Sequence, residues 1–213
     1  TAYGGVSNSN NGTVFKVNID GTGYQIIHSF STFPDFRSTN MDGAHPRSAL
    51  MISSNTLFGT ARDGGVNAGG TAFKINLDGT SFAILHSFGS DGDGFVVGGG
   101  LVLAGNTLFG TTAYGGSNST GAIFRMNTDG SGYSLLKHFS ALTYDPFLGY
   151  YRSIDGQSPL AGLMLAGGTL FGTTSGGGTN GNGTAFKINT DGSGFSTLHN
   201  FGDSPNGSRP EST

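Results

Sequence analysis

Apolar and polar residues alternate over short stretches of this chain, with the period of two that is typical of half-buried β-strands. In residues 121–139, AIFRMN and YSLLKHF are two such stretches, and the turn sequence TDGSG separates them. Closely similar segments occur at three other places, so the strand pair is repeated. The four copies are GTVFKVNIDGTGYQIIHSF (12–30), GTAFKINLDGTSFAILHSF (70–88), GAIFRMNTDGSGYSLLKHF (121–139) and GTAFKINTDGSGFSTLHNF (183–201).

A second repeated segment lies between these copies and predicts two more strands in each period. It reads ALMISSNTLFGT (49–60), GLVLAGNTLFGT (100–111) and GLMLAGGTLFGT (162–173). The third and fourth predicted strands are joined by Asp-Gly, which supplies the positive φ angles that tight hairpins need. The acidic residue of this turn is Asp20, Asp78, Asp129 or Asp191.

Four strands joined by tight turns form a small antiparallel sheet that cannot bury both of its faces alone, so the copies must stack. Radial stacking of such sheets gives a β-propeller. We therefore expect an all-β fold, a β-propeller of four-stranded antiparallel blades with about four blades in this chain. A stacked β repeat array would produce the same pattern and is the alternative.

The repeats divide the chain into one domain, residues 1–213, with four periods. These are 1–59 (incomplete at its start), 60–110, 111–172 and 173–213 (incomplete at its end). Thr1 aligns with Thr112, so most of the first two strands of the first period are missing, and a further segment like 163–173 would complete four periods. We expect a window on a longer array. A strand-sharing homo-oligomer or fibre is the alternative, because an open sheet edge invites pairing.

Composition agrees with a folded, turn-rich β protein. The chain has 40 Gly, yet 17 Phe and 7 Tyr supply apolar material that disordered chains lack. The net charge of −3 and the absence of any basic block argue against nucleic acid and anionic membranes as partners. No apolar run reaches membrane-spanning length, so no membrane insertion is expected in this segment. Cysteine is absent, which excludes disulfides and thiolate metal sites.

The phrases GTVFKVNIDGTGY, LHSF and LVLAGNTLFGTTAYGG resemble the GloVer tandem repeat of bacterial choice-of-anchor surface proteins. The resemblance covers essentially the whole chain. It implies export and an extracellular or cell-surface location, with attachment through a C-terminal sorting segment. It supplies no catalytic motif, and it supports the propeller prediction without indicating a ligand.

Two long insertions after the fourth strands, residues 31–48 and 140–159, are the best candidate binding loops. Aromatic residues with Arg are typical of protein interfaces and of sugar-stacking surfaces. The alternative is that these aromatics fold back and cover the adjacent blade. The candidate residues are Phe33, Phe36 and Arg37 in the first loop and Tyr144, Phe147, Tyr150, Tyr151 and Arg152 in the second.

Two features of the repeated strands have a structural and a functional interpretation. A cation recurs in the third strand (Lys16, Lys74, Arg125, Lys187), and we interpret it as a solvent-facing side chain that pairs weakly with nearby Asp, with a ring for an anionic ligand as the alternative. A histidine recurs in the fourth strand (His28, His86, His199), with Lys137 in the third copy. We expect hydrogen-bonded histidines rather than a metal site.

Two weaker candidates remain. Asp91 and Asp93 in SDGDG resemble the start of a calcium loop but lack its distal Glu, so calcium is a weak candidate ligand and no other cofactor is expected. Sequons begin at Asn11, Asn118, Asn182 and Asn206, where glycosylation depends on the host and chance occurrence is the favoured explanation.

These observations favour a non-enzymatic extracellular or cell-surface repeat protein, acting as a structural, adhesive or assembly module. Its partners would be other protein subunits or surface polysaccharide, and a lectin-like polysaccharide-binding propeller is the alternative. A propeller hydrolase or lyase ranks third, since the chain lacks the G-x-S-x-G motif and has a single Glu at position 211.

Overall fold

The computed structural model describes residues 10–33, 39–90, 92–147, 149–202 and 207–210. All regular structure in these ranges is β-strand, and they contain no helix. The described part of the chain therefore has no helix that could span a membrane. The prediction of an all-β fold is confirmed.

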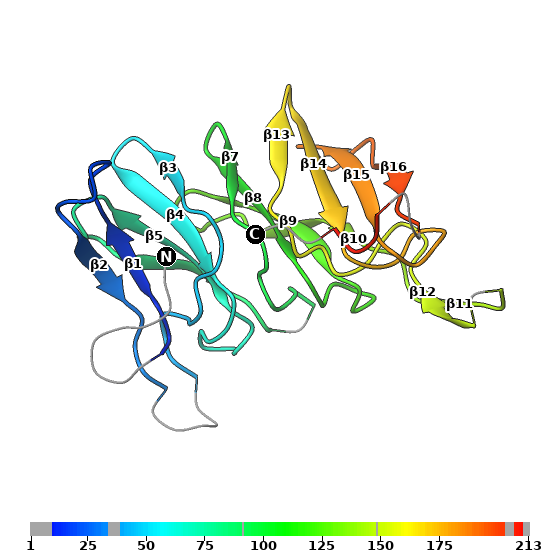
Figure 1. The fold of residues 1–213 in the computed structure, drawn as a ribbon, viewed down its shortest axis with the longest axis horizontal. Coiled ribbons are helices and arrows are strands. Elements are labelled where there is room, and N and C mark those ends of the chain that lie inside the picture. Colours follow the sequence, from blue (N-terminus) through cyan, green and yellow to red (C-terminus); the bar gives the residue numbers. More distant parts are fainter. Residues whose placement is uncertain (1–9, 34–38, 91, 148, 203–206, 211–213) are drawn as a thin grey trace.

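Three four-stranded antiparallel sheets run in the order of the chain, with each strand paired to the next (Figure 1). A two-stranded sheet precedes them, and a separate hairpin lies between the second and third four-stranded sheets. The strands are β1 (Thr13–Lys16) and β2 (Gln25–Ser29); β3 (Met51–Ser53), β4 (Thr56–Ala61), β5 (Thr71–Asn76) and β6 (Ala83–Ser87); β7 (Val102–Ala104), β8 (Thr107–Thr112), β9 (Ala122–Asn127) and β10 (Ser134–His138); β11 (Thr143–Asp145) and β12 (Tyr150–Arg152); and β13 (Met164–Ala166), β14 (Thr169–Thr174), β15 (Thr184–Asn189) and β16 (Ser196–Asn200).

The repeated sheets lie one after another, from β1–β2 at one end to β13–β16 at the other, and none closes on itself (Figure 1). The core is divided into three apolar clusters, one at each junction between consecutive sheets. Phe73, Phe124 and Phe186, at one position of the repeat, are each fully or almost fully buried in one of these clusters. Stacking of repeated sheets thus buries the apolar faces that the alternation predicts.

A β-bulge occurs at one position of the repeat, where the third and fourth strands of each sheet pair. In the first sheet, Val14 pairs with His28 and Phe15 pairs with Ile26, so Ile27 is the extra residue. The other sheets have the same shift, with Leu85, Leu136 and Leu198 as extra residues. A bulge changes the direction of the side chains that follow it. It allows Ile27 and His28, although consecutive, both to contact the following sheet.

The sheets converge where their first strands begin. Thr60 Oγ1 donates a hydrogen bond to Gly99 O at 3.1 Å. At the next junction, the equivalent Thr111 Oγ1 donates to Ala161 O at 3.2 Å. A cavity of about 340 Å³ lies at this convergence, lined by residues 49–51, 100–102 and 161–163. All of its lining residues are glycine or apolar.

A glycine is required where the chain enters each four-stranded sheet. Gly94 has a φ of +93°, and a Cβ there would lie 2.3 Å from Thr112 Oγ1. Gly43 and Gly156 occupy the same position against Thr71 and Thr174. Only glycine combines this left-handed backbone with so close an approach.

Candidate partner-binding site

The second long insertion forms a hairpin that carries a group of exposed aromatic side chains. We call β11, β12 and their connection, residues 143–152, the aromatic hairpin. Phe147 is 98% exposed, Tyr151 is 63% exposed and Tyr150 is 43% exposed. Figure 1 shows the hairpin extending away from the sheets at the lower right, below β16. A group of exposed aromatic side chains on one hairpin is typical of an interaction surface.

An ion pair holds the two strands of the hairpin together. Arg152 Nε donates to Asp145 Oδ2 at 2.8 Å, and a second guanidinium nitrogen contacts the same oxygen. The third nitrogen donates to the backbone oxygen of Gly178, in the bend before β15. Both charged side chains are largely buried, so this two-pronged pair is shielded from water. Arg152, a predicted site residue, therefore positions the hairpin.

The tyrosines have two different roles. Tyr150 Oη donates to Asn180 O at 3.2 Å, so this ring attaches the hairpin to the same bend. A Cβ on Gly181 would lie 1.8 Å from Tyr150 Oη, which explains the glycine there. Tyr144 and Tyr151 pack edge to face, with ring centroids 5.3 Å apart, and leave much of their surface exposed. The structure thus brings the predicted residues of this loop together.

A hollow of about 500 Å³ lies against the hairpin. Phe147 and Ile154 supply apolar surface, and Asp145 and Arg152 supply polar atoms at its wall. This volume is within the range of small-molecule sites. The full lining is Thr143, Tyr144, Asp145, Pro146, Phe147, Arg152 and Ile154.

The first long insertion is described only in part. Phe33 is half-buried after β2, whereas Phe36 and Arg37 lie outside the described residues. Of these three candidates, the described part of the chain therefore places Phe33 alone.

Two of the recurring histidines, His28 and His86, lie at sheet junctions, and each faces an acid from the following loop. His28 Nε2 lies 3.3 Å from Asp42 Oδ2, and His86 Nε2 lies 3.1 Å from Asp93 Oδ2. At the third junction Lys137 takes this position and contacts Asp155 at 2.5 Å. This pairing was not predicted from the sequence.

At two of these acids, hydrogen bonds (and, at Asp155, a nearby charge) lower the pKa by more than burial raises it. Burial raises the pKa of Asp155, but the hydrogen bonds from Lys137 and Ser140 outweigh it, and the pKa lies below its usual value. The same balance, with His28 in place of the lysine, lowers the pKa of Asp42. Both carboxylates are therefore charged and used inside the fold.

Asp93, one of the two calcium candidates, is mostly buried and hydrogen-bonded. Its carboxylate accepts from the Gly89 N–H at 3.0 Å, from Ser90 Oγ at 2.9 Å and faces His86. Asp91 lies outside the described residues. Within the described ranges no three His, Cys, Asp or Glu side chains are grouped as metal ligands. Calcium binding stays an untested prediction.

Three of the four sequon asparagines lie in the polar bend before the third strand of a repeat. Asn11 is 6% exposed, and its Nδ2 donates to Ser31 O at 2.5 Å. Asn118 is half-buried and its Nδ2 donates to Phe139 O at 2.8 Å. Asn182 is also half-buried, and Asn206 lies outside the described residues. A glycan on Asn11 would need space that its burial does not leave, so Asn11 is not a favourable acceptor in the folded chain.

Fold and site together define a class: an all-β repeat protein built of stacked antiparallel sheets. The model of one family, the Gloeobacter/Verrucomicrobia repeat, matches residues 1–213. The chain belongs to this family, which confirms the GloVer resemblance. Comparison with curated proteins finds no significant match.

Two solved structures resemble the chain over most of its length. The crystal structure of a nidogen/laminin complex is 17% identical with a TM-score of 0.41, and the match covers 90% of this chain and 73% of that one. The crystal structure of the tricorn protease is 12% identical with a TM-score of 0.50. That match covers 93% of this chain but 17% of the protease chain, and at this identity the likeness concerns the fold alone.

Proposed function

We propose that this protein is a non-enzymatic β-propeller-type scaffold, extracellular or at the cell surface, which binds a partner protein through the aromatic hairpin. Its role would be structural or adhesive. The observation that carries the proposal is the exposure of Phe147 (98%) and Tyr151 (63%) on a hairpin held by a largely buried ion pair. The surface location comes from the family resemblance alone.

The propeller arrangement, with about four blades in this chain, is supported by two features. Consecutive repeated sheets stack face to face through equivalent positions. The starts of their first strands meet at one cavity, as radial packing requires. A hydrolase or lyase on this scaffold would need titratable groups at that cavity, and its lining is apolar or glycine.

Binding of a protein is favoured by the kind of surface that the hairpin presents. Aromatic side chains lose little conformational entropy on binding and bury a large apolar area. Phe147, the most exposed of them, has no polar group to offer a sugar. The positioning role of Arg152 and Tyr150 keeps the hairpin preorganised, which reduces the entropic cost of binding.

A lectin-like polysaccharide binder is the second candidate. The hollow beside the hairpin combines Tyr144 and Phe147 rings with the Asp145 carboxylate. Aromatic faces and a carboxylate acceptor suit a sugar, because rings stack on its apolar face while the carboxylate accepts from its hydroxyls.

The test compares variants of the hairpin with a matched control. Phe147→Ala and Tyr151→Ala change exposed side chains, so both variants should fold normally and should lose binding to extracellular protein, and the wild-type chain should show no saturable binding on a glycan array. Tyr114→Ala, at a site as exposed as Tyr150 (43% each), is the control that should bind normally. Saturable binding to one oligosaccharide, lost in Tyr151→Ala, would identify the lectin. Unchanged binding in both hairpin variants would contradict the proposed site.

A further inference from the structure

Every junction between consecutive sheets uses the same set of contacts. We call the surface that a sheet turns toward the preceding sheet its N-side face, and the opposite surface its C-side face. On the C-side face, the ring of His28 stacks on Phe82 of the next sheet at 3.7 Å, and His86 stacks on Tyr133 at 3.8 Å. At the third junction the ammonium of Lys137 lies 4.6 Å from the ring of Phe195. A cation or imidazole thus meets an aromatic ring each time.

The recurring cation of the third strand belongs to the same junction. Lys16 Nζ donates to Leu77 O at 3.3 Å, beside the Asp-Gly turn of the next sheet. The pKa of Asp78 lies below its usual value, mainly because Thr80 donates hydrogen bonds to its carboxylate. The charge of Lys16 lowers this pKa further. The two later junctions repeat this interaction, with Lys74 acting on Asp129 and Arg125 acting on Asp191.

The bulge residue completes the junction. The glycine of the turn packs against it so closely that a Cβ on Gly79 would lie 2.9 Å from Ile27 O, and a Cβ on Gly130 would lie 2.6 Å from Leu85 O. Each repeated sheet therefore offers a bulge, a cation from the third strand, and an imidazole (or the Lys137 ammonium in β7–β10) on its C-side face. Each following sheet offers a glycine turn, an acid and an aromatic ring.

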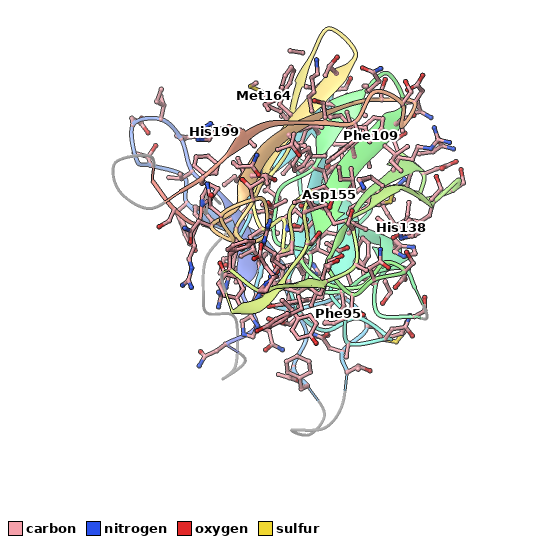
Figure 2. All side chains as sticks on the ribbon, turned by 90° about the vertical axis from the view of Figure 1, so that its right-hand side faces the viewer. Phe95, Phe109, His138, Asp155, Met164 and His199 are labelled. Carbon is pink, nitrogen blue, oxygen red and sulfur yellow. The ribbon has the colours of Figure 1, made fainter. Side chains whose placement is uncertain are left out.

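The C-side face of the last sheet presents this set without a described partner. Leu198, the bulge residue, is 51% exposed, and Met164 on β13 is 62% exposed. Figure 2 views the molecule from this end, with Met164 and His199 labelled. A groove of about 340 Å³ runs along this face, lined by Phe171, Ala185 and Leu198 among others. Phe58 and Phe109, the equivalents of Phe171, are buried by a following sheet.

The N-side face of β1–β2 presents the complementary set. Tyr24 is 59% exposed and Val17 is 47% exposed, whereas Ile75, at the position of Val17 in the next repeat, is fully buried. A Cβ on Gly21 would meet nothing within 4 Å, unlike its equivalents at the junctions. Asp20 is exposed in the same turn.

We propose that the C-side face of β13–β16 binds the N-side face of β1–β2 of a second copy, reproducing the internal junction between two chains. His199 then stacks on Tyr24 of the other copy, Lys187 approaches its Asp20, and Leu198 covers its Gly21. The occupant follows from the structure, because the two open faces carry the two halves of one contact set that the chain already forms three times. Charge agrees as well, since a cation meets an acid.

The contact is head to tail, so it leaves one complementary face open at each end of a dimer. Such an interface closes into a ring if the rotation permits and otherwise extends into a filament. It involves other residues than the aromatic hairpin and does not depend on the proposed function. The two described strands of β1–β2 offer only the third- and fourth-strand half of a junction, so we expect a weak association.

Mixing of two blocked variants tests this arrangement. Leu198→Asp places a charge on the C-side face, and Tyr24→Asp places one on the N-side face. Both positions are more than half exposed, so the folded monomer should keep its stability. Val66→Asp, at an exposed apolar residue of the bend before β5, is the matched control. The readout is sedimentation velocity over a range of concentrations, with thermal unfolding at low concentration as the check on folding.

The wild-type chain and Val66→Asp should associate as concentration rises. Each blocked variant alone should remain monomeric, because every contact needs one intact face of each kind. Their equimolar mixture should form a one-to-one complex and stop there, since Tyr24→Asp retains its C-side face and Leu198→Asp its N-side face. A monomeric wild-type chain, a mixture that stays monomeric, or a blocked variant that associates like the wild-type chain would overturn the proposal.

Discussion

Two phenylalanines at the same position of the repeat should differ sharply in their contribution to stability. Phe109 lies on the C-side face of β7–β10 and is 2% exposed, in a cluster with Leu163, Leu170 and Phe186 of the following sheet. Phe171 has the same place on β13–β16, where no following sheet is described, and it is half-buried. Replacing each by alanine therefore compares one side chain with and without a neighbouring sheet.

Phe109→Ala should lower the free energy of unfolding by about 3–5 kcal/mol, the usual cost of deleting a buried phenylalanine. Phe171→Ala should cost about 1 kcal/mol, because its ring is not enclosed and no closed cavity is left behind. The assay is urea unfolding followed by circular dichroism, at a concentration low enough to keep the chain monomeric. Equal losses for the two variants would refute the reasoning that burial of this face depends on the following sheet.

Three further changes test the internal geometry, each by urea unfolding. Gly94→Ala should lose more than about 2 kcal/mol from backbone strain and a clash, and Gly105→Ala, with a positive φ but open space, about 1 kcal/mol or less. Tyr133→Phe should lose about 1 kcal/mol, because its hydroxyl donates to the Asp93 backbone oxygen at 2.6 Å. Asp155→Asn should destabilise at neutral pH, where the carboxylate is charged and hydrogen-bonded. Because the folded pKa of Asp155 lies below the unfolded one, this stability is fully present above the unfolded pKa, so the difference between the two proteins should shrink as pH falls through the folded pKa. A wild-type curve parallel to that of Asp155→Asn from neutral to acidic pH would contradict the last expectation.

The repeated strands could be predicted because each carries its own signal. The alternation in AIFRMN matches β9 residue for residue, and the Asp-Gly turns form as expected, with Asp129 accepting from the hydroxyl and N–H of Ser131. Local rules suffice for such elements, since hairpin pairing and turn chemistry involve neighbours in sequence.

The junction contacts could not be predicted from the same patterns. His86 and Asp93 are 7 residues apart, whereas Lys137 and Asp155 are 18 apart, because insertions of different length separate them. Spacing therefore gave no signal of a repeated pair. The bulge could not be predicted either, because Leu85 fits an ordinary alternating strand. Only the pairing register between β5 and β6 shows that Leu85 is the extra residue.

The candidate site was predicted only as a set of loop residues. The aromatics of the second insertion suggested a binding surface, and Phe147 and Tyr151 lie exposed on it. That the loop folds into β11 and β12 could not be foreseen, because its two strands are three residues each and have no counterpart among the described residues of the other repeats. Arg152 positions the hairpin by donating a hydrogen bond to Gly178 O, a backbone oxygen of another repeat. Sequence spacing cannot reveal such a contact.

The central claim is that the open faces at the two ends of the chain are the two halves of the junction that stacks the sheets. The chain has no cysteine, so single cysteines introduced by His199→Cys and by Tyr24→Cys provide a direct test. The two variants are mixed, oxidised and separated by non-reducing electrophoresis and mass spectrometry. The account predicts that the mixed disulfide forms much faster than either homodimer, because only that pair stacks at the junction. Homodimers that form as fast as the mixed species would contradict it.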